Sequence, residues 1–191
     1  EPDLGPILDT LSVFRRFGPW LLKDLIKAGQ IFTNVDEHDL VTRLTGTYLL
    51  HRENGCLEDS ITQRLLNIRM RCTDKPKFHR LCTLGRDFYH SRLSYPKTIH
   101  PVQWAVEYLC LGLQCAYFVE NQRGADLKAA FLGLVAECRR LLKTWEGQSL
   151  YVDFIQALRD DWELEFLTNY FLSKKDAYAD EYAEILIQIE D

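Results

Sequence analysis

The sequence has few of the residues that characterise disordered, fibrous or low-complexity chains. Its 191 residues include only 10 glycines and 6 prolines, which excludes collagen-like and linker-like repeats. The formal net charge is a modest −5, and aromatic residues make up 12% of the chain. Such a chain can bury more apolar surface than disordered chains do. The composition therefore predicts a folded protein with its own hydrophobic core.

The sequence also lacks the short motifs that mark common enzymes. It contains no glycine-rich phosphate-binding loop, no H-E-x-x-H zinc motif and no G-x-S-x-G nucleophile turn. Acid–base residues can still meet in space from distant positions, so an enzyme assembled in that way is one alternative. We predict that the protein is not an enzyme and that it needs no cofactor.

Neither a membrane-spanning segment nor a secretion signal is visible. The longest apolar run, from Trp104 to Val119, is interrupted by Glu107 and is shorter than the roughly 18 residues of a spanning helix. The acidic start at Glu1–Asp3 has no signal-peptide pattern. The sequence thus predicts no membrane partner, reduced thiols and an intracellular location, cytoplasmic or nuclear. A secreted helical protein of the cytokine type is the alternative, because six cysteines permit disulfides.

Hydrophobic residues recur at helical spacing along almost the whole chain, and no segment alternates as a half-buried strand would. Breaks such as Gly18–Pro19, Asn54–Gly55 and Ser94–Pro96 divide the pattern into eight to ten helices. We assign Asn54–Gly55 to a turn that ends a helix rather than to a hairpin, since its flanks alternate poorly. The predicted fold class is all-α, either a multi-helix bundle or an irregular α-solenoid of antiparallel helix pairs.

The segment 101–120 gives the strongest helix signal. Pro101 suits a first helical turn, and apolar residues occupy nearly all sides of the helix, so we place it at the centre of the fold. Residues 150–172 are predicted to form one helix, or two with a break near Asp160. The length of 191 residues predicts a single domain over 1–191. Because the chain starts without methionine, we expect this domain to be excised from a larger protein. Sub-lobes at 1–97 and 98–191 are the alternative.

Three local predictions concern the N-terminal half. Asn34 followed by Glu37 has the spacing of a helix capping pair. A loop is predicted at Thr73–Pro76, because proline disfavours helix at the residue before it. In the helix that precedes this loop, four apolar residues are expected to be buried: Leu57, Ile61, Leu65 and Ile68.

The segment 64–97 is strongly basic, with nine Lys and Arg residues against two Asp residues. Aromatic residues lie between the charges: Phe78, Phe88, Tyr89 and Tyr95. Cations bind phosphates and rings stack on bases, so the segment is a candidate nucleic-acid interface. It equally fits an acidic protein partner, or a solvated face whose arginines pair locally. The candidate partner-binding residues are Arg69, Arg71, Lys75, Lys77 and Arg80.

Four residues of the same segment are of the types that bind zinc: Cys72, His79, Cys82 and His90. Their spacing lacks the short pair of ligands that is typical of structural zinc sites. We therefore interpret Cys82 as a core thiol and the histidines as surface residues, and we predict no metal.

The segment 151–191 is acidic, with eleven Asp and Glu residues against three Lys and Arg residues. This negative charge would favour packing on the basic segment, within one chain or in a second chain.

Helical spacing divides six apolar residues of this segment into two stripes, Trp162, Phe166 and Tyr170 against Leu164, Leu167 and Phe171. Either neighbouring helices cover both stripes, or one stripe faces a partner. Large aromatic residues in an acidic rim are typical interface anchors. The stripe of Trp162, Phe166 and Tyr170 is therefore a candidate partner-binding surface in addition to the basic segment.

These observations together predict a non-enzymatic protein–protein interaction or scaffold module, a subunit of an intracellular complex. Another protein is the expected partner. The alternative function is nucleic-acid binding through the basic segment 64–97.

Overall fold

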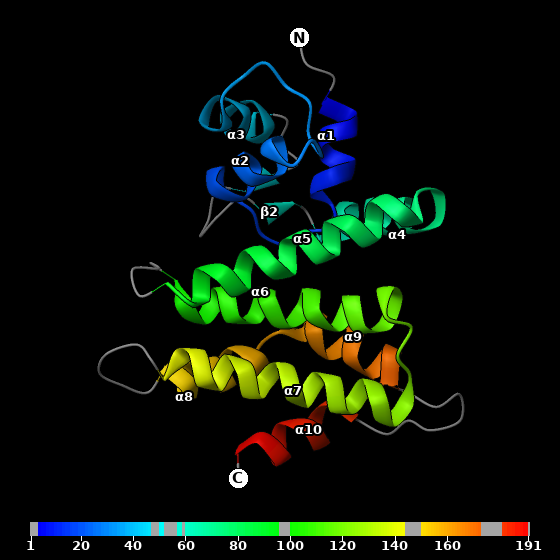
Figure 1. The fold of residues 1–191 in the computed structure, drawn as a ribbon, viewed down its shortest axis with the longest axis vertical. Coiled ribbons are helices and arrows are strands. Elements are labelled where there is room, and N and C mark those ends of the chain that lie inside the picture. The colour runs from blue at the N-terminus through cyan, green and yellow to red at the C-terminus, as the bar shows by residue number, and fades with distance from the viewer. Residues whose placement is uncertain are drawn as a thin grey trace. The chain divides into compact units, whose positions relative to one another are not determined.

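The fold was analysed in a computed structural model that describes residues 4–46, 50–51, 57–58, 60–95, 100–143, 150–172 and 181–190. These residues form ten α-helices, one π-helical segment and one pair of two-residue strands (Figure 1). The predicted all-α fold of eight to ten helices is thus confirmed. Within the described ranges, no helix combines the length and the apolar character needed to cross a bilayer.

The chain divides into two compact units, Glu1–Leu81 and Cys82–Asp191. The division falls inside one helix, whereas the sequence placed its alternative sub-lobe boundary at residue 97. The N-terminal unit contains α1 (Leu4–Leu11), α2 (Pro19–Lys27), α3 (Glu37–Thr45), β1 (Leu50–His51), β2 (Leu57–Glu58), α4 (Ser60–Thr73) and the first turns of α5 (Lys75–Leu93).

The two short strands were not predicted. β1 and β2 pair antiparallel, with Leu50 opposite Glu58 and His51 opposite Leu57. The assignment of Asn54–Gly55 to a helix-ending turn therefore missed this pairing, although those two residues themselves lie outside the described part of the chain. Strands of two residues are too short to show alternating hydrophobicity, which is the signal that sequence reasoning uses.

The cap of α3 also differs from the prediction. The carboxylate of Asp36 accepts hydrogen bonds from the backbone N–H groups of His38 at 2.8 Å and Asp39 at 3.0 Å. Asp36 is therefore the N-cap residue, and the predicted pairing of Asn34 with Glu37 was wrong. The helix begins at Glu37, so a cap at position 34 would lie too far from the first turn.

The predicted loop at Thr73–Pro76 shrinks to one residue, Asp74, between α4 and α5. Its carboxylate accepts a hydrogen bond from the backbone N–H of Lys77 at 3.0 Å. This bond satisfies a donor of the first turn of α5, where Pro76 is tolerated because no intrahelical N–H is required there. A helix therefore restarts directly after the break.

The face of α4 that packs against α1 combines the buried Met70 with two side-chain amides. The side-chain amides of Gln63 and Asn67 both donate to the backbone oxygen of Ser12, at 3.2 and 3.3 Å. As a result, Leu65 and Ile68 lie on the other side of the helix and are 63% and 47% exposed. The prediction that they are buried was wrong, and the side chains of Leu57 and Ile61 lie outside the described residues.

The C-terminal unit is built around α6 (Pro101–Gln114), which packs against α7 (Gly124–Leu142) and α8 (Leu150–Arg159), as Figure 1 shows. Every residue of α6 from Ala105 to Gln114 is buried. The helix predicted at the centre of the fold is thus the central helix of the C-terminal unit, because a helix without a polar face needs neighbours on all sides. The predicted segment 150–172 contains two helices, α8 and α9 (Trp162–Leu172), and α10 (Glu181–Glu190) follows them.

The α6 rod ends in a π-helical segment, η1 (Cys115–Val119), which the sequence did not indicate. The N–H of Glu120 donates to the oxygen of Cys115 at 2.9 Å, which widens the turn. Two rings of this segment contact Phe171 of α9. Tyr117 stacks on it at 4.1 Å between ring centroids, and Phe118 meets it edge-on at 5.2 Å. The π-helical segment thus fixes one face of α9 against the core.

Candidate protein-interaction surface

α9 starts at a short break after α8. The carboxylate of Asp161 accepts a hydrogen bond from the backbone N–H of Leu164 at 2.9 Å, which is the geometry of an N-terminal cap. The helix contains Glu163 and Glu165 in its first turn and no Lys or Arg residue. Acidic residues at this position interact favourably with the helix dipole, so the negative charge here also stabilises the helix.

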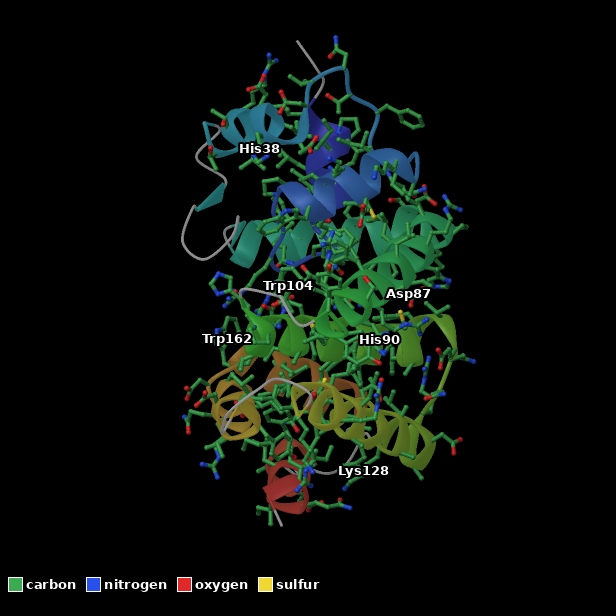
Figure 2. The ribbon with its side chains drawn as sticks, turned by 60° about the vertical axis from the view of Figure 1, so that its left-hand side comes forward. His38, Asp87, His90, Trp104, Lys128 and Trp162 are labelled. Atoms are coloured by element: carbon green, nitrogen blue, oxygen red, sulfur yellow. The ribbon has the colours of Figure 1, made fainter. Side chains whose placement is uncertain are left out.

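The stripe of Trp162, Phe166 and Tyr170, here called the α9 stripe, faces solvent. Their exposed fractions are 54%, 56% and 58%. Residues four apart share a helix face, and the rings of Phe166 and Tyr170 stack at 6.3 Å with an interplanar angle of 14°. Figure 2 labels Trp162 on the left-hand side of the C-terminal unit. The described surface therefore presents three large aromatic side chains in a row.

The opposite face of α9 is buried in the C-terminal unit. Leu164 is fully buried, and Phe171 is 5% exposed. Of the two stripes that the sequence separated, the one with Leu164 and Phe171 faces the core and the other faces solvent. The buried stripe anchors α9 in the C-terminal unit, so substitutions in the exposed stripe leave the contacts of Leu164 and Phe171 with the core in place.

Acidic residues flank the α9 stripe on both sides. At 100° per residue, Glu163 lies roughly 60° from the centre of the stripe on one side, and Glu165 lies roughly 100° from it on the other. Asp160 and Asp161 add two further negative charges directly before the helix. The α9 stripe is therefore an aromatic surface in an acidic rim.

The five basic candidate residues do not line a single helix face. Arg69 and Arg71 lie two residues apart on α4, and Lys75 and Lys77 lie two apart on α5, so each pair points to different sides. Arg69 forms an ion pair with the carboxylate of Asp9. This arrangement resembles local pairing on solvated helices more than a continuous phosphate-binding track.

Three of the four aromatic residues in the basic segment belong to the core. Phe78 is fully buried, and Phe88 and Tyr89 are 8% and 4% exposed. Tyr95 alone among the four is exposed, at 60%. Stacking on nucleic-acid bases requires rings that a base can reach, so these buried rings are unsuited to that role.

A second apolar stripe, which sequence reasoning missed, lies on α4. Leu65, Ile68 and Cys72 are exposed and follow at steps of three and four residues, so they share one face, here called the α4 stripe. By the same helical angles, Arg69 lies on one side of this stripe, and Arg64 and Arg71 lie on the other. The arginines around an apolar set were the signal in the sequence that this face is exposed.

The four zinc-type residues have separate surroundings. Cys82 is fully buried, as predicted, while Cys72 is exposed on α4 and His90 contacts Glu137. Among the residues that the structure places, no group of three or more His, Cys, Asp or Glu could hold a metal ion. The five described cysteines are thiols, and Cys56 lies outside the described ranges.

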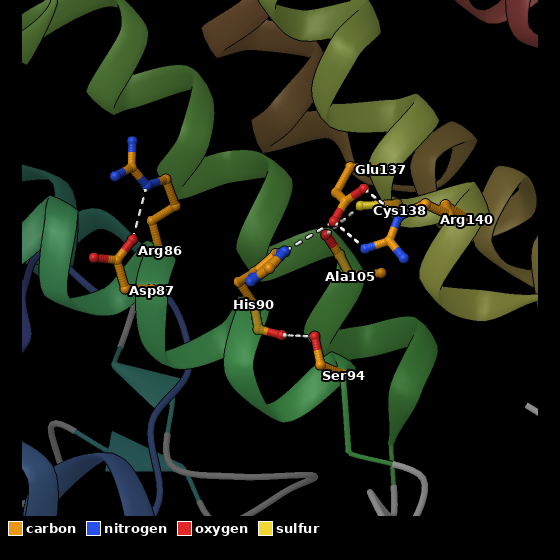
Figure 3. Close-up of polar contacts among 8 residues, drawn as sticks. All are labelled: Arg86, Asp87, His90, Ser94, Ala105, Glu137, Cys138 and Arg140. Carbon is orange, nitrogen blue, oxygen red and sulfur yellow. Dashed lines mark hydrogen bonds and ion pairs between the residues drawn. The ribbon is translucent and has the colours of Figure 1, made fainter. Parts of the chain in front are cut away.

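His90, Glu137 and Arg140 form a polar cluster in the C-terminal unit (Figure 3). Glu137 Oε1 lies 2.9 Å from His90 Nε2, and both Glu137 oxygens accept from Arg140 at 2.6 and 2.7 Å. The neighbouring Cys138 thiol donates to the Ala105 carbonyl, and burial raises the pKa of that thiol far above its usual range. The cluster thus ties α5 to α7 and contains no activated nucleophile among its drawn members.

This cluster predicts a measurable dependence of stability on pH. The hydrogen bonds from Arg140, with a smaller effect of His90, lower the pKa of Glu137 from 4.5 to about 2. Because the folded pKa is the lower one, the unfolded state takes up the proton first, and stability falls as the pH drops from about 4.5 to about 2. Partial exposure limits the contribution to about 1 kcal/mol.

Urea unfolding of the wild type and of Glu137→Gln measures this contribution. The wild type should be more stable at about pH 6, and the two curves should converge as the pH falls through about 2, since Glu137 then becomes protonated in the folded state as well as in the unfolded state. A difference that is equally large at both pH values would show that the glutamate acts through packing and not through its charge.

Comparison of the chain with protein-family models, with curated proteins and with solved structures finds no match in any of the three. The class of the protein therefore follows from its fold alone: it is an all-α protein built of many helices.

Proposed function

We propose that this chain is a non-enzymatic protein–protein interaction and scaffold module that acts inside the cell. The observation that carries the proposal is the α9 stripe, three aromatic side chains that are each more than half exposed on a helix anchored by its other face. Trp and Tyr are among the residues that contribute most to binding at protein interfaces, because they bury large areas with little loss of side-chain entropy.

The acidic rim indicates the chemistry of the partner. Glu163 and Glu165 favour a segment that carries Lys or Arg beside its apolar residues. Burial of the three rings would supply most of the affinity, whereas the charges would govern the choice of partner and the association rate. An amphipathic basic helix, with apolar residues three and four apart, fits this surface best.

The structure gives less support to nucleic-acid binding than to protein binding. The five basic candidates are spread over two helices and do not line one helix face, and the buried rings of Phe78, Phe88 and Tyr89 are out of reach of bases. Protein recognition through α9 therefore accounts for more of the described surface.

The test compares proteins captured from a cell extract by the wild type and by Trp162→Ala/Phe166→Ala. The strongest partner is then purified, and its affinity for both forms is measured. We expect the double variant to bind at least about tenfold more weakly, as for hot-spot residues. Phe32→Ala is the matched control, because Phe32 is an exposed aromatic residue of the N-terminal unit, at 87%.

Circular dichroism must first show that the double variant keeps its helices. Equal affinity of the folded double variant and the wild type would contradict the proposal. Binding of a labelled oligonucleotide at about 50 mM salt, where phosphate contacts are strongest, would instead favour the basic segment as a nucleic-acid interface.

A further inference from the structure

The two apolar stripes of this chain are complementary in charge. α4 carries three arginines and no acidic residue over Ser60–Thr73, whereas α9 carries two glutamates and no basic residue over Trp162–Leu172. In each helix the charged residues flank the exposed apolar side chains. The α4 stripe thus has a basic rim, in which Arg69 also pairs with Asp9 of α1, and the α9 stripe has an acidic rim.

The side chains of the two stripes are also complementary in kind. The α4 stripe consists of the aliphatic Leu65 and Ile68 with the small Cys72, and the α9 stripe consists of large flat rings. Aliphatic side chains pack well against aromatic faces, and the α4 stripe has the apolar residues beside positive charge that the acidic α9 rim favours. The large apolar side chains of both stripes are exposed to solvent.

We propose that the protein associates with a second copy of itself, in which the α9 stripe of one copy docks on the α4 stripe of the other. This inference rests on the proposed function, because it names the partner of the same α9 surface. The contact joins two different surfaces and is therefore heterologous. In a dimer, one copy contributes its α9 stripe and the other its α4 stripe, and the remaining stripe of each copy stays available for a further copy.

The dimensions of the helices set the expected strength. At 1.5 Å per residue, α4 is about 21 Å long and α9 about 16 Å, so the contact is one helix on another. Small interfaces of this kind are typical of weak and transient association. Self-association should therefore appear at concentrations of tens to hundreds of micromolar, which is roughly the range expected of small interfaces, and should weaken as salt screens the rims.

Sedimentation velocity over that concentration range tests the inference. The wild type should form dimers or larger species as the concentration rises. Two single-surface variants should stay monomeric when measured alone: Phe166→Ala combined with Trp162→Ala for the α9 stripe, and Leu65→Ser combined with Ile68→Ser for the α4 stripe. All four positions are exposed, so the variants should keep their folds, which circular dichroism verifies.

Mixing the two variants is the decisive measurement. The α9 variant keeps an intact α4 stripe, and the α4 variant keeps an intact α9 stripe, so the mixture should form a one-to-one dimer and nothing larger. Val152→Ser is the matched control, since Val152 is 64% exposed on α8 and lies outside both stripes; it should associate as the wild type does.

If either double variant is poorly folded, Glu163→Lys/Glu165→Lys supplies a second test. Reversing the acidic rim should abolish association at low salt, because like charges would then face the arginines of α4. A wild type that stays monomeric over the whole range, or a mixture without the dimer, would overturn the inference. If self-association fails but another protein still loses affinity for Trp162→Ala/Phe166→Ala, the proposed function stands and only the identity of the partner is wrong.

Discussion

Phe171→Ala is expected to lower the free energy of unfolding of the C-terminal unit by about 3–5 kcal/mol, the range for buried aromatic residues. Phe171 is 5% exposed and contacts the rings of both Tyr117 and Phe118. Truncation removes a stacked and an edge-on contact and leaves a cavity that the π-helical segment cannot fill without moving. Chemical unfolding followed by tryptophan fluorescence measures the loss.

Phe166→Ala is the control for this prediction on the same helix. Phe166 is 56% exposed, so its truncation should change the free energy of unfolding by no more than about 0.5 kcal/mol. Similar losses from both variants would mean that the exposed ring is also a packing residue. In that case, reduced binding by Phe166→Ala could not be assigned to a lost partner contact.

Tyr182→Ala is expected to release α10 from the C-terminal unit, at a cost of about 3–5 kcal/mol for the docked helix. Tyr182 is 2% exposed, and its hydroxyl donates to the oxygen of Leu158 at 2.7 Å. Its backbone N–H donates to Asn169 Oδ1 at 2.9 Å, and its ring contacts Phe131 at 6.4 Å. The tyrosine side chain thus joins α10 to α7 and α8, and its backbone joins α10 to α9.

Hydrogen exchange resolves whether the effect is local. Amides of α10 should lose protection in Tyr182→Ala while those of α6 keep theirs, because the terminal helix can open without the central rod. Tyr182→Phe keeps the ring and removes only the hydroxyl, so it should cost about 1 kcal/mol. Uniform loss of protection in both helices would show that α10 is an integral part of the core and not a separately docked element.

The sequence alone determined those elements whose local pattern has a single solution. The segment 101–120 is apolar on nearly all sides, so only a central helix can bury it, and Ala105–Gln114 is indeed buried throughout. Pro19 and Pro101 mark helix starts because proline fixes the backbone angle of a first turn. The two stripes of α9 follow from the helical period in the same way.

Tertiary contacts decided which of two available faces is buried. On α9, the rings of η1 pack on Phe171, and this places Phe166 on the solvent side. On α4, the amides of Gln63 and Asn67 bond the Ser12 oxygen on the face that also buries Met70, so Leu65 and Ile68 are exposed. Helical spacing records which residues share a face, but the choice of face depends on partners more than fifty positions away, which local hydrophobicity does not encode.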